Sequence, residues 1–316
     1  MDLIYTDSSG SDEGVLKNYE MDFDIGDTED FELKLTISAE RIAPGSFVYA
    51  ERSEIFGVVD EQNVDGRTII YCGRTIRGIM NKKIVEPDLG QDYKTLNGDL
   101  LDVLNEMSVD FGIGSIVKFA STQSYRVKNY KVDRYISFLA TIEKLLKNFG
   151  LKMTYNYTGV FMLIDIVPVI DYSDNLEYDS NNTIRYKIDQ KRQVNHLICL
   201  GKGELAARQV IHLYVDAKGN VSKIQTMYGI DEMTEVYDYS SAESIEELEK
   251  SGIKKLQEYN SESIDIDVDA QTETVGDIVG TYDPITGKTI KGTIVSKVVK
   301  VKNNIVSVEF KVGEVE

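Results

Sequence analysis

The stretch FELKLTI, residues 31–37, alternates apolar and polar side chains at every position. A period of two puts all of the apolar side chains on one face of an extended chain, as in a half-buried β-strand. Similar short strand-like runs follow at Phe47–Tyr49, Ile55–Val59 and Arg67–Cys72. Strands of this length and spacing predict a small β-barrel or β-sandwich over residues 1–80.

The region from about residue 81 to residue 170 carries two apolar stripes at helical spacing. The first stripe is Leu96, Leu100, Leu101, Leu104 and Met107, and the second is Tyr135, Phe138, Leu139, Ile142, Leu145, Leu146 and Phe149. Gly150 stands where a helix commonly ends in a left-handed residue. A hairpin around Thr158 and Gly159 is expected next. We therefore predict an α/β domain over residues 81–170.

From residue 171 onward the pattern is again typical of strand, with one helix inserted. Strands are expected at 183–188, 194–200, 209–215 and 221–227. Ser240 is followed three residues later by Glu243, a capping pair that predicts a helix over about 240–260, and Gly252 is the weak point of this helix. The sequence thus predicts a mainly β chain with α/β insertions, divided into residues 1–80, 81–170 and 171–316. The last part would be a second β-barrel-like domain.

Charge and composition restrict the classes of protein. No apolar run approaches the roughly 18–20 residues that cross a membrane, so no membrane insertion is expected. The N-terminal letters MDLIYTDSSGSDEG lack the basic and apolar parts of a signal peptide. We therefore expect a protein that stays in the cytoplasm or leaves it by a route other than secretion. The net charge of −18 disfavours nucleic-acid binding by a basic surface, because that mode depends on Lys and Arg.

The letters GTYDPITGKT, residues 280–289, end like a nucleotide-binding P-loop. A P-loop has four residues between its first Gly and Gly-Lys-Ser/Thr, whereas six separate Gly280 from Gly287 here. Asp283 would repel a phosphate, and Pro284 has no N–H to donate. Residues 289–295 are rich in β-branched side chains, which indicates a strand in place of the expected helix. We therefore predict a β-turn at residues 283–287 between two strands, and no nucleotide.

Two further motifs have weak alternatives. The letters GKGELAAR, residues 201–208, resemble a dinucleotide-binding loop, but the third Gly is missing and no strand–helix alternation follows. We predict a tight turn with a short helical segment there. Asp265, Asp267 and Asp269 share one face of a strand, as oxygen ligands of a cation could. Because the Gly and distal Glu of a calcium loop are absent, a solvated acidic face is favoured.

The two histidines, His196 and His212, lie in apolar strand-like segments. Either could pair with a carboxylate, but no nucleophile motif such as G-x-S-x-G accompanies them, which favours structural roles. Cys72 and Cys199 are far apart in strand-like runs, as expected for small buried side chains and not for a disulfide or zinc site. The sequence therefore predicts no catalytic residue, no metal ligand and no cofactor-binding residue.

Three groups of segments are notable for their order along the chain. The first is residues 22–26 with 30–33, the second is 195–205 running on through 208–214, and the third is 275–280 with 294–295 and 306–309. Together they resemble a family of siphovirus tail proteins from phages and prophages of Gram-positive bacteria. The resemblance extends over nearly the whole chain. That family is similar in turn to the baseplate hub proteins of long-tailed phages and of phage-tail-like bacteriocins.

The resemblance implies a structural, non-enzymatic hub in the tail tip or baseplate. It implies a homotrimer in which two related barrels per subunit form a ring with pseudo-sixfold symmetry, with the helical α/β parts outside. Such a ring joins a hexameric tail tube protein to a trimeric spike or fibre protein and contacts other baseplate proteins. An acidic lumen would let DNA or a tape-measure protein pass as transient cargo without adhering. The expected location is a virion tail or tail-like particle assembled in the bacterial cytoplasm.

Two alternatives remain open at this point. A tail-associated peptidoglycan hydrolase would need paired carboxylates or a His–carboxylate pair in a cleft. A host-glycan-binding adhesion module would use some of the 19 tyrosines as platforms, although tyrosines in strands more often serve packing. Because the chain ends at Glu316, we expect a separate protein to supply any lytic or fibre domain.

Overall fold

The computed structural model describes residues 1–36, 41–173, 184–189, 193–260, 263–268, 273–283 and 288–315, with the backbone alone at 184–189, 260, 263–268, 281–283, 288–290 and 314–315. The contacts within it divide the chain into two units. Unit 1 comprises Met1–Arg185 and Ile266–Glu316, and unit 2 comprises Tyr186–Asp265. Each unit has a hydrophobic core of its own. The expected division at residues 1–80, 81–170 and 171–316 stays a prediction.

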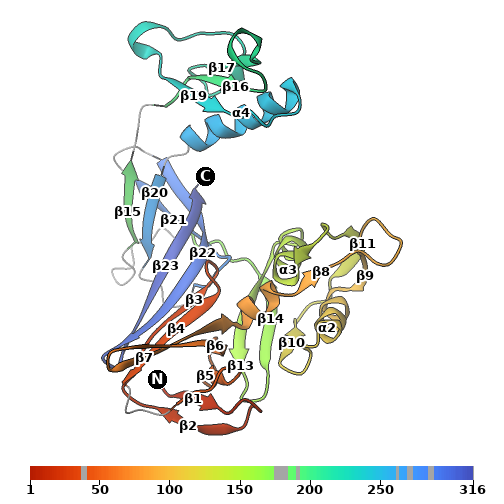
Figure 1. Cartoon of the computed structure of the whole chain (residues 1–316), viewed down its shortest axis with the longest axis vertical. Coiled ribbons are helices and arrows are strands. Elements are labelled where there is room, and N and C mark those ends of the chain that lie inside the picture. Colours follow the sequence, from red (N-terminus) through yellow and green to blue (C-terminus); the bar gives the residue numbers. More distant parts are fainter. Residues whose placement is uncertain are drawn as a thin grey trace. The chain divides into compact units, whose positions relative to one another are not determined.

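Unit 1 is built on one large sheet (Figure 1). Its strands are β1 (Leu3–Thr6), β2 (Asp12–Leu16), β3 (Glu20–Ile25), β4 (Asp30–Thr36), β5 (Phe47–Tyr49), β6 (Phe56–Asp65), β7 (Thr68–Thr75), β21 (Ile278–Asp283), β22 (Lys288–Lys302) and β23 (Ile305–Val315). Their order is β2-β1-β5-β6-β7-β4-β3-β22-β21, and β23 pairs with β22. This path does not close on itself among the described strands, so the barrel-like shape stays a prediction.

Residues 31–36 of the alternating stretch lie in β4. Phe31, Leu33 and Leu35 are buried, whereas Glu32 and Lys34 lie at the surface. Each buried side chain of this kind contributes about 1.5–3 kcal/mol by leaving water. The strand lies between β3 and β7 and pairs antiparallel with both. The mainly β character of the N-terminal region is therefore confirmed.

The C-terminal strands share this sheet with the N-terminal ones. β22 pairs antiparallel with β3, which places Val299 opposite Phe23 and Val301 opposite Met21 (Figure 1). Val299 and Val301 are buried in the same core as β1–β7. A strand near residue 300 thus completes a core that begins at Leu3.

The remainder of unit 1 is the helical part. It contains α1 (Ile76–Asn81), β8 (Ile84–Val85), β9 (Thr95–Asp99), α2 (Leu100–Asp110), β10 (Val117–Ala120), β11 (Arg126–Lys131), β12 (Ile136–Ser137), α3 (Phe138–Lys147), β13 (Leu151–Tyr157) and β14 (Met162–Pro168). β13 and β14 form the expected hairpin, and β10 adds parallel to β14. Gly150 has the expected left-handed conformation after α3, with φ 67°.

The two helices that the apolar stripes predicted, α2 and α3, begin later than expected. Leu96, the first residue of the first stripe, lies in β9 and not in a helix. α2 begins at Leu100, and the Asp99 carboxylate caps it by accepting from the N–H of Leu101 at 3.0 Å. α3 begins at Phe138, where the hydroxyl of Ser137 accepts from the N–H of Ala140 at 3.1 Å. These caps decide the helix starts, since they satisfy N–H groups that have no partner within the helix.

A buried ion cluster joins the helical part to the large sheet. Arg77 of α1 is 5% exposed, and its Nε lies 2.8 and 2.7 Å from the two carboxylate oxygens of Glu29, between β3 and β4. The same guanidinium contacts Glu143 of α3 at 2.7 Å and donates to the Tyr155 hydroxyl of β13 at 2.9 Å. Burial opposes the charge of Arg77, but Tyr155, Glu29 and Glu143 outweigh it and hold the pKa well above its ordinary value.

Unit 2 is a four-stranded sheet with one long helix. Its elements are β16 (His196–Leu200), the 3₁₀ turn η1 (Leu205–Ala207), β17 (Val210–Val215), β18 (Val221–Ser222), the 3₁₀ turn η2 (Gly229–Asp231), β19 (Thr234–Asp238) and α4 (Ile245–Asn260). The strand order is β18-β17-β16-β19, with β19 parallel to β16. The core of unit 2 is Leu197, Cys199, Leu213, Val215, Ala242, Leu248 and Leu256. Two further strands, β15 (Ile184–Asp189) and β20 (Ser263–Val268), pair with each other.

Three expectations for unit 2 need correction. The strand expected at residues 221–227 ends at Ser222. The strand β19 was not predicted from the sequence. The capping pair is four residues later than predicted. The Ser244 hydroxyl accepts from the N–H of Glu247 at 3.1 Å, and the Glu247 carboxylate accepts from the N–H of Glu243 at 2.9 Å. α4 therefore begins at Ile245.

Gly252 has a low helix propensity, but the packing of α4 on the sheet requires a glycine at this position. A Cβ atom at this position would lie 2.5 Å from Cys199 Sγ and 2.8 Å from Leu213 Cδ1. The helix can therefore approach the sheet this closely only because position 252 has no side chain. Within the described residues, no helix is long and apolar enough to span a membrane.

Candidate functional site

Both histidines of the chain lie on one face of the unit 2 sheet. His196 of β16 stands opposite Tyr214 of β17, and His212 stands opposite Ile198. Side chains alternate along a strand, so these four occupy the face opposite the core residues Leu197 and Leu213. The rings of His196 and Tyr214 stack with centroids 4.4 Å apart. The sequence placed each histidine in a strand, but the pairing of β16 with β17 brings them together.

A chain of three hydrogen-bonding groups runs across this face. His196 Nδ1 lies 2.7 Å from Glu232 Oε1, and His196 Nε2 lies 2.8 Å from His212 Nδ1. The Thr234 hydroxyl donates to the same Glu232 oxygen at 3.2 Å. Hydrogen bonding from His196 lowers the pKa of the Glu232 carboxyl, and Thr234 adds to the effect. Only His196 is largely buried, at 8% exposed.

This geometry gives the ring nitrogens complementary roles. With Glu232 ionised, His196 donates from Nδ1, and its Nε2 lone pair accepts from His212 Nδ1–H. The cluster therefore links β16, β17 and the segment before β19 through side-chain hydrogen bonds.

Thr234 adds a further contact to this cluster. The Thr234 hydroxyl lies 3.1 Å from His196 Nδ1, the nitrogen that already faces the carboxylate, so it is directed at Glu232. Across the residues that the structure describes, no group of three or more His, Cys, Asp or Glu side chains is arranged to hold a metal ion. The structural role expected for the histidines stays a prediction, now with a defined geometry.

The P-loop-like segment belongs to a β-hairpin. β21 and β22 pair antiparallel from Ile278↔Thr293 to Asp283↔Lys288. The strand β22 occupies the place where a P-loop would have a helix, as predicted. The turn at residues 284–287, and any ring or spike contact it makes, lie outside the described residues.

The other sequence motifs have these outcomes. Residues 201–208 form a turn with Gly203 at φ 106° and the short η1, followed by β17, as predicted. The side chains of Asp265, Asp267 and Asp269 lie outside the described residues. Cys199 is buried beneath α4, and burial raises the pKa of its thiol to about 11. Cys72 is half-buried in β7, and both cysteines are free thiols.

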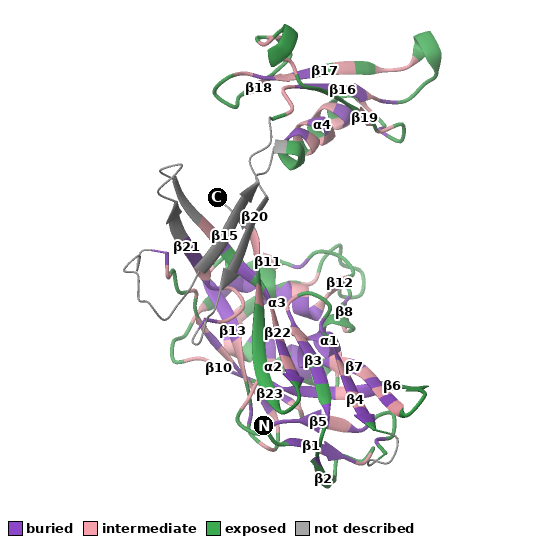
Figure 2. Ribbon diagram, turned by 90° about the vertical axis from the view of Figure 1, so that its left-hand side faces the viewer, coloured by how far each residue is buried: buried purple, intermediate pink, exposed green. Residues whose placement is uncertain are grey.

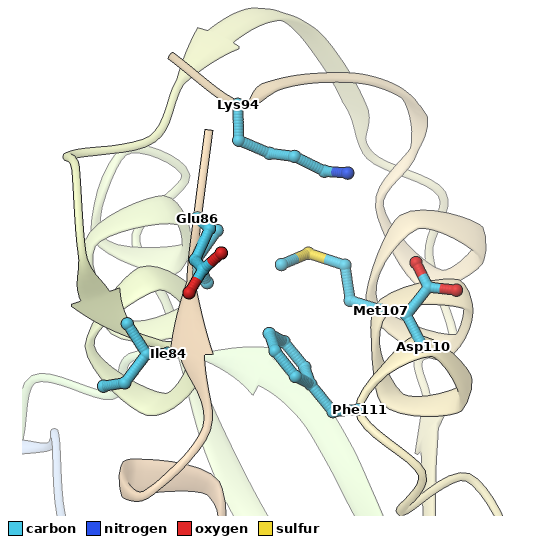
Figure 3. Close-up of a pocket in the computed structure, with 7 residues that line it drawn as sticks. Ile84, Glu86, Lys94, Met107, Asp110 and Phe111 are labelled. Carbon is cyan, nitrogen blue, oxygen red and sulfur yellow. The ribbon is translucent and has the colours of Figure 1, made fainter. Parts of the chain in front are cut away.

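Unit 1 has a pocket of about 300 Å³ between β8 and α2 (Figure 3). Figure 3 shows Ile84 and Glu86 across the pocket from Met107 and Phe111, with Asp110 at its edge. Lys94 at the rim is held by Asp88 at 2.8 Å. The pocket thus has an apolar floor and a margin with two carboxylates and one ammonium group, and no sequence motif predicted it.

A second hollow of about 370 Å³ lies beside a buried ion pair between Lys152 of β13 and Asp277, which precedes β21. Asp277 is 1% exposed and also accepts from the N–H of Ile170 at 2.9 Å. Since its carboxylate is engaged by Lys152 and by the backbone, this pair serves to fasten β13 to β21. Neither hollow supplies an evident chemical function.

Comparisons with known proteins concern the fold of the whole chain. No protein-family model and no curated protein sequence matches it. The solved structure of prophage tail protein gp18 from Listeria monocytogenes EGD-e is similar with a TM-score of 0.50 and 14% identity, covering 99% of this chain and 94% of that one. The 43 kDa tail protein of prophage MuSo2 from Shewanella oneidensis is similar with a TM-score of 0.50 and 12% identity, covering 99% of this chain and 98% of that one. The chain thus has a fold that is similar to those of phage tail proteins.

Proposed function

We propose that the protein is a structural component of a phage tail or phage-tail-like particle, and specifically its tail-tip or baseplate hub. The observation that carries this proposal is the likeness in fold over 99% of the chain to two proteins described as prophage tail proteins. The segments that resemble siphovirus tail proteins support it independently, since they were identified from the sequence. The proposed role is structural and not enzymatic.

The proposed assembly is a homotrimeric ring. Each copy would contribute two barrel-like β regions, so that three copies match a hexameric tail tube on one side and a trimeric spike or fibre on the other. Other baseplate proteins would contact the helical part. The net charge of −18 suits a lumen through which DNA or a tape-measure protein passes without adhering.

The test is electron microscopy of native particles that carry a label at the C-terminus of this chain. We expect three labels, related by a threefold axis, at the distal end of the tail tube. Labels spread along the tube, or particles without any label, would contradict the hub proposal.

One observation favours a second candidate, a tail-associated peptidoglycan hydrolase. His196 and Glu232 form the His–carboxylate pair that such an enzyme would need, at 2.7 Å. Zymography on cell walls separates the two proposals, because a structural hub produces no clearing. Clearing by the native chain that His196→Ala abolishes would favour the enzyme. The glycan-binding alternative stays a prediction, to be tested by binding of the full chain to host glycans.

A further inference from the structure

The hollow between β8 and α2 combines an apolar floor with carboxylates on two sides. Met107, which is 5% exposed, and Phe111 form the floor, and Ile84 of β8 lies across from them (Figure 3). Glu86 stands on the β8 side and Asp110 on the α2 side. The hollow contains no reactive side chain, so its use would be binding and not chemistry.

The charges around the hollow leave two carboxylates over. The ammonium group of Lys94 at the rim is engaged by the Asp88 carboxylate at 2.8 Å. Glu86 and Asp110 form no ion pair with any other residue that the structure describes. Both are exposed, as is most of the segment at residues 86–92 (Figure 2). A positively charged group can therefore reach both carboxylates from solvent.

The end of α2 adds to the negative potential of the hollow. Asp110 is the last residue of the helix and Phe111 its C-terminal cap, where the helix dipole places partial negative charge. The last turn of α2 contains no basic residue. An acidic side chain here opposes the dipole of its own helix, and a cation bound in the hollow would relieve this repulsion.

These features together favour an arginine side chain of a partner protein as the occupant. An apolar floor suits its aliphatic stem, and two carboxylates beside an aromatic ring suit a planar guanidinium, which donates in several directions and stacks on rings. The volume of about 300 Å³ is at the low end for ligand pockets, which suits one side chain. A second copy of this chain is disfavoured as the partner, because its net charge of −18 would be repelled.

We propose that this hollow is a docking site for an arginine in an exposed segment of another tail or baseplate protein. The arginine stem would cover Met107 and Phe111, and the guanidinium would bridge Glu86 and Asp110. The proposal gives the chemistry of a contact between the helical part and its neighbours in the particle, and in that respect it rests on the proposed function.

The first test is a titration of the full chain, followed by NMR of its methionine methyl groups. Met107 is the reporter, and its resonance is assigned with Met107→Leu. The probe is N-acetyl-arginine amide, and the matched control is N-acetyl-citrulline amide, which has nearly the same shape without the charge. We expect arginine to shift the Met107 resonance in a saturable way and citrulline to bind at least about tenfold more weakly. No shift, or equal affinity for the two probes, would overturn the proposal.

Single substitutions test the two carboxylates. Glu86→Gln and Asp110→Asn each remove one charge at the hollow, and Glu106→Gln, at an exposed position of α2 outside the hollow, removes the same charge as the matched control. We expect each hollow variant to weaken arginine binding at least about threefold and the control to change it less than about 1.5-fold. Equal effects of the three variants would refute the site.

The thermal unfolding midpoint separates binding from stability at Asp110. Asp110→Asn removes an acidic group from the C-terminal end of α2, so the midpoint should stay the same or rise while arginine binding weakens. A lower midpoint with unchanged binding would show that Asp110 serves the fold and would contradict its place in the site.

A photo-crosslinking phenylalanine analogue in place of Val109, which is 63% exposed and adjacent to Asp110, identifies the partner in native particles. We expect a cross-linked peptide from a different tail or baseplate protein that contains an arginine. Replacing that arginine by glutamine should lower the yield at least about threefold. Cross-links only to this chain, a yield that does not depend on any arginine, or no cross-link would overturn the assignment of the partner.

The outcome is separable from that of the hub proposal. Arginine binding is measured on the isolated full chain and does not depend on the position of the chain in a particle. Labels at the tail tip without arginine binding would retain the hub and exclude this site. Arginine binding and the cross-link without labels at the tail tip would retain the site and exclude the hub.

Discussion

The Glu232 carboxylate sets how unit 2 responds to acid. Its pKa lies below the ordinary value of 4.5, because His196 and Thr234 donate to it. A group with a lowered pKa in the folded state stabilises that state at higher pH, and the contribution is lost as the pH falls through the lowered value. Acidification through this lowered pKa therefore removes the Glu232 charge and weakens its hydrogen bond with His196.

We expect Glu232→Gln to lower the thermal unfolding midpoint of unit 2 near neutral pH, and we expect its difference from wild type to shrink as the pH falls through the lowered pKa of Glu232 and the wild-type carboxylate is protonated as well. Differential scanning calorimetry across this range measures both values. Glu235→Gln, at an exposed position of β19, serves as the control and should show no such convergence. A gap between Glu232→Gln and wild type that persists at low pH would contradict this explanation.

Arg77 is the residue whose loss should matter most in unit 1. Arg77→Met would leave the Glu29 carboxylate, 6% exposed, without its cation, and we expect a loss of about 3–5 kcal/mol of unfolding free energy. Urea denaturation measures this change. Glu143→Gln removes a partner that is 45% exposed and should cost less than about 1 kcal/mol. If Arg77→Met and Glu143→Gln were equally mild, the cluster would not be the link described above.

At the scale of single elements, helix starts depend on side chains that satisfy free N–H groups. For α4 the sequence offers two Ser-x-x-Glu patterns, Ser240 with Glu243 and Ser244 with Glu247. Both amino-acid patterns match the capping-box motif equally well. The structure uses the second one, and Leu248, in the first turn of the helix, lies in the core of unit 2.

We expect Ser244→Ala to destabilise unit 2 by about 1 kcal/mol, the usual effect of losing an N-cap side chain. Ser240→Ala, at an exposed position before the helix, should change the unfolding free energy by less than half as much. The two variants differ only in which serine is lost. Chemical denaturation followed by helical circular dichroism compares them, and the reverse order would restore the cap predicted from the sequence.

At the scale of the whole molecule, the two units have separate cores, and each should unfold as its own cooperative transition. Gly252→Val would force a side chain against Cys199 and Leu213 and should lower only the transition of unit 2. Arg77→Met should lower only that of unit 1. Calorimetry of the full chain tests both variants. A single transition that both variants shift together would show that the two units unfold as one.

Local sequence patterns predicted the elements whose signals are local. The alternation in residues 31–37 marked β4, the stripe from Phe138 to Leu146 marked α3, and the β-branched run after Gly287 marked β22. Where two local signals competed, as at Ser240 and Ser244, the sequence alone chose wrongly. β19 was omitted because its letters, TEVYD, have few apolar residues, and its position is fixed by parallel pairing with β16.

The sequence by itself determined the mainly β character, the principal helices and the hairpin around residues 284–287, since each depends on neighbours along the chain. Only the tertiary structure decided that β22 completes the sheet begun by β1, that Arg77 meets Glu29, and that His196 meets both His212 and Glu232. These contacts join residues 16 to about 280 positions apart. Periodicity reports which face of an element is buried, whereas partners are chosen by the packing and pairing of elements distant in the chain.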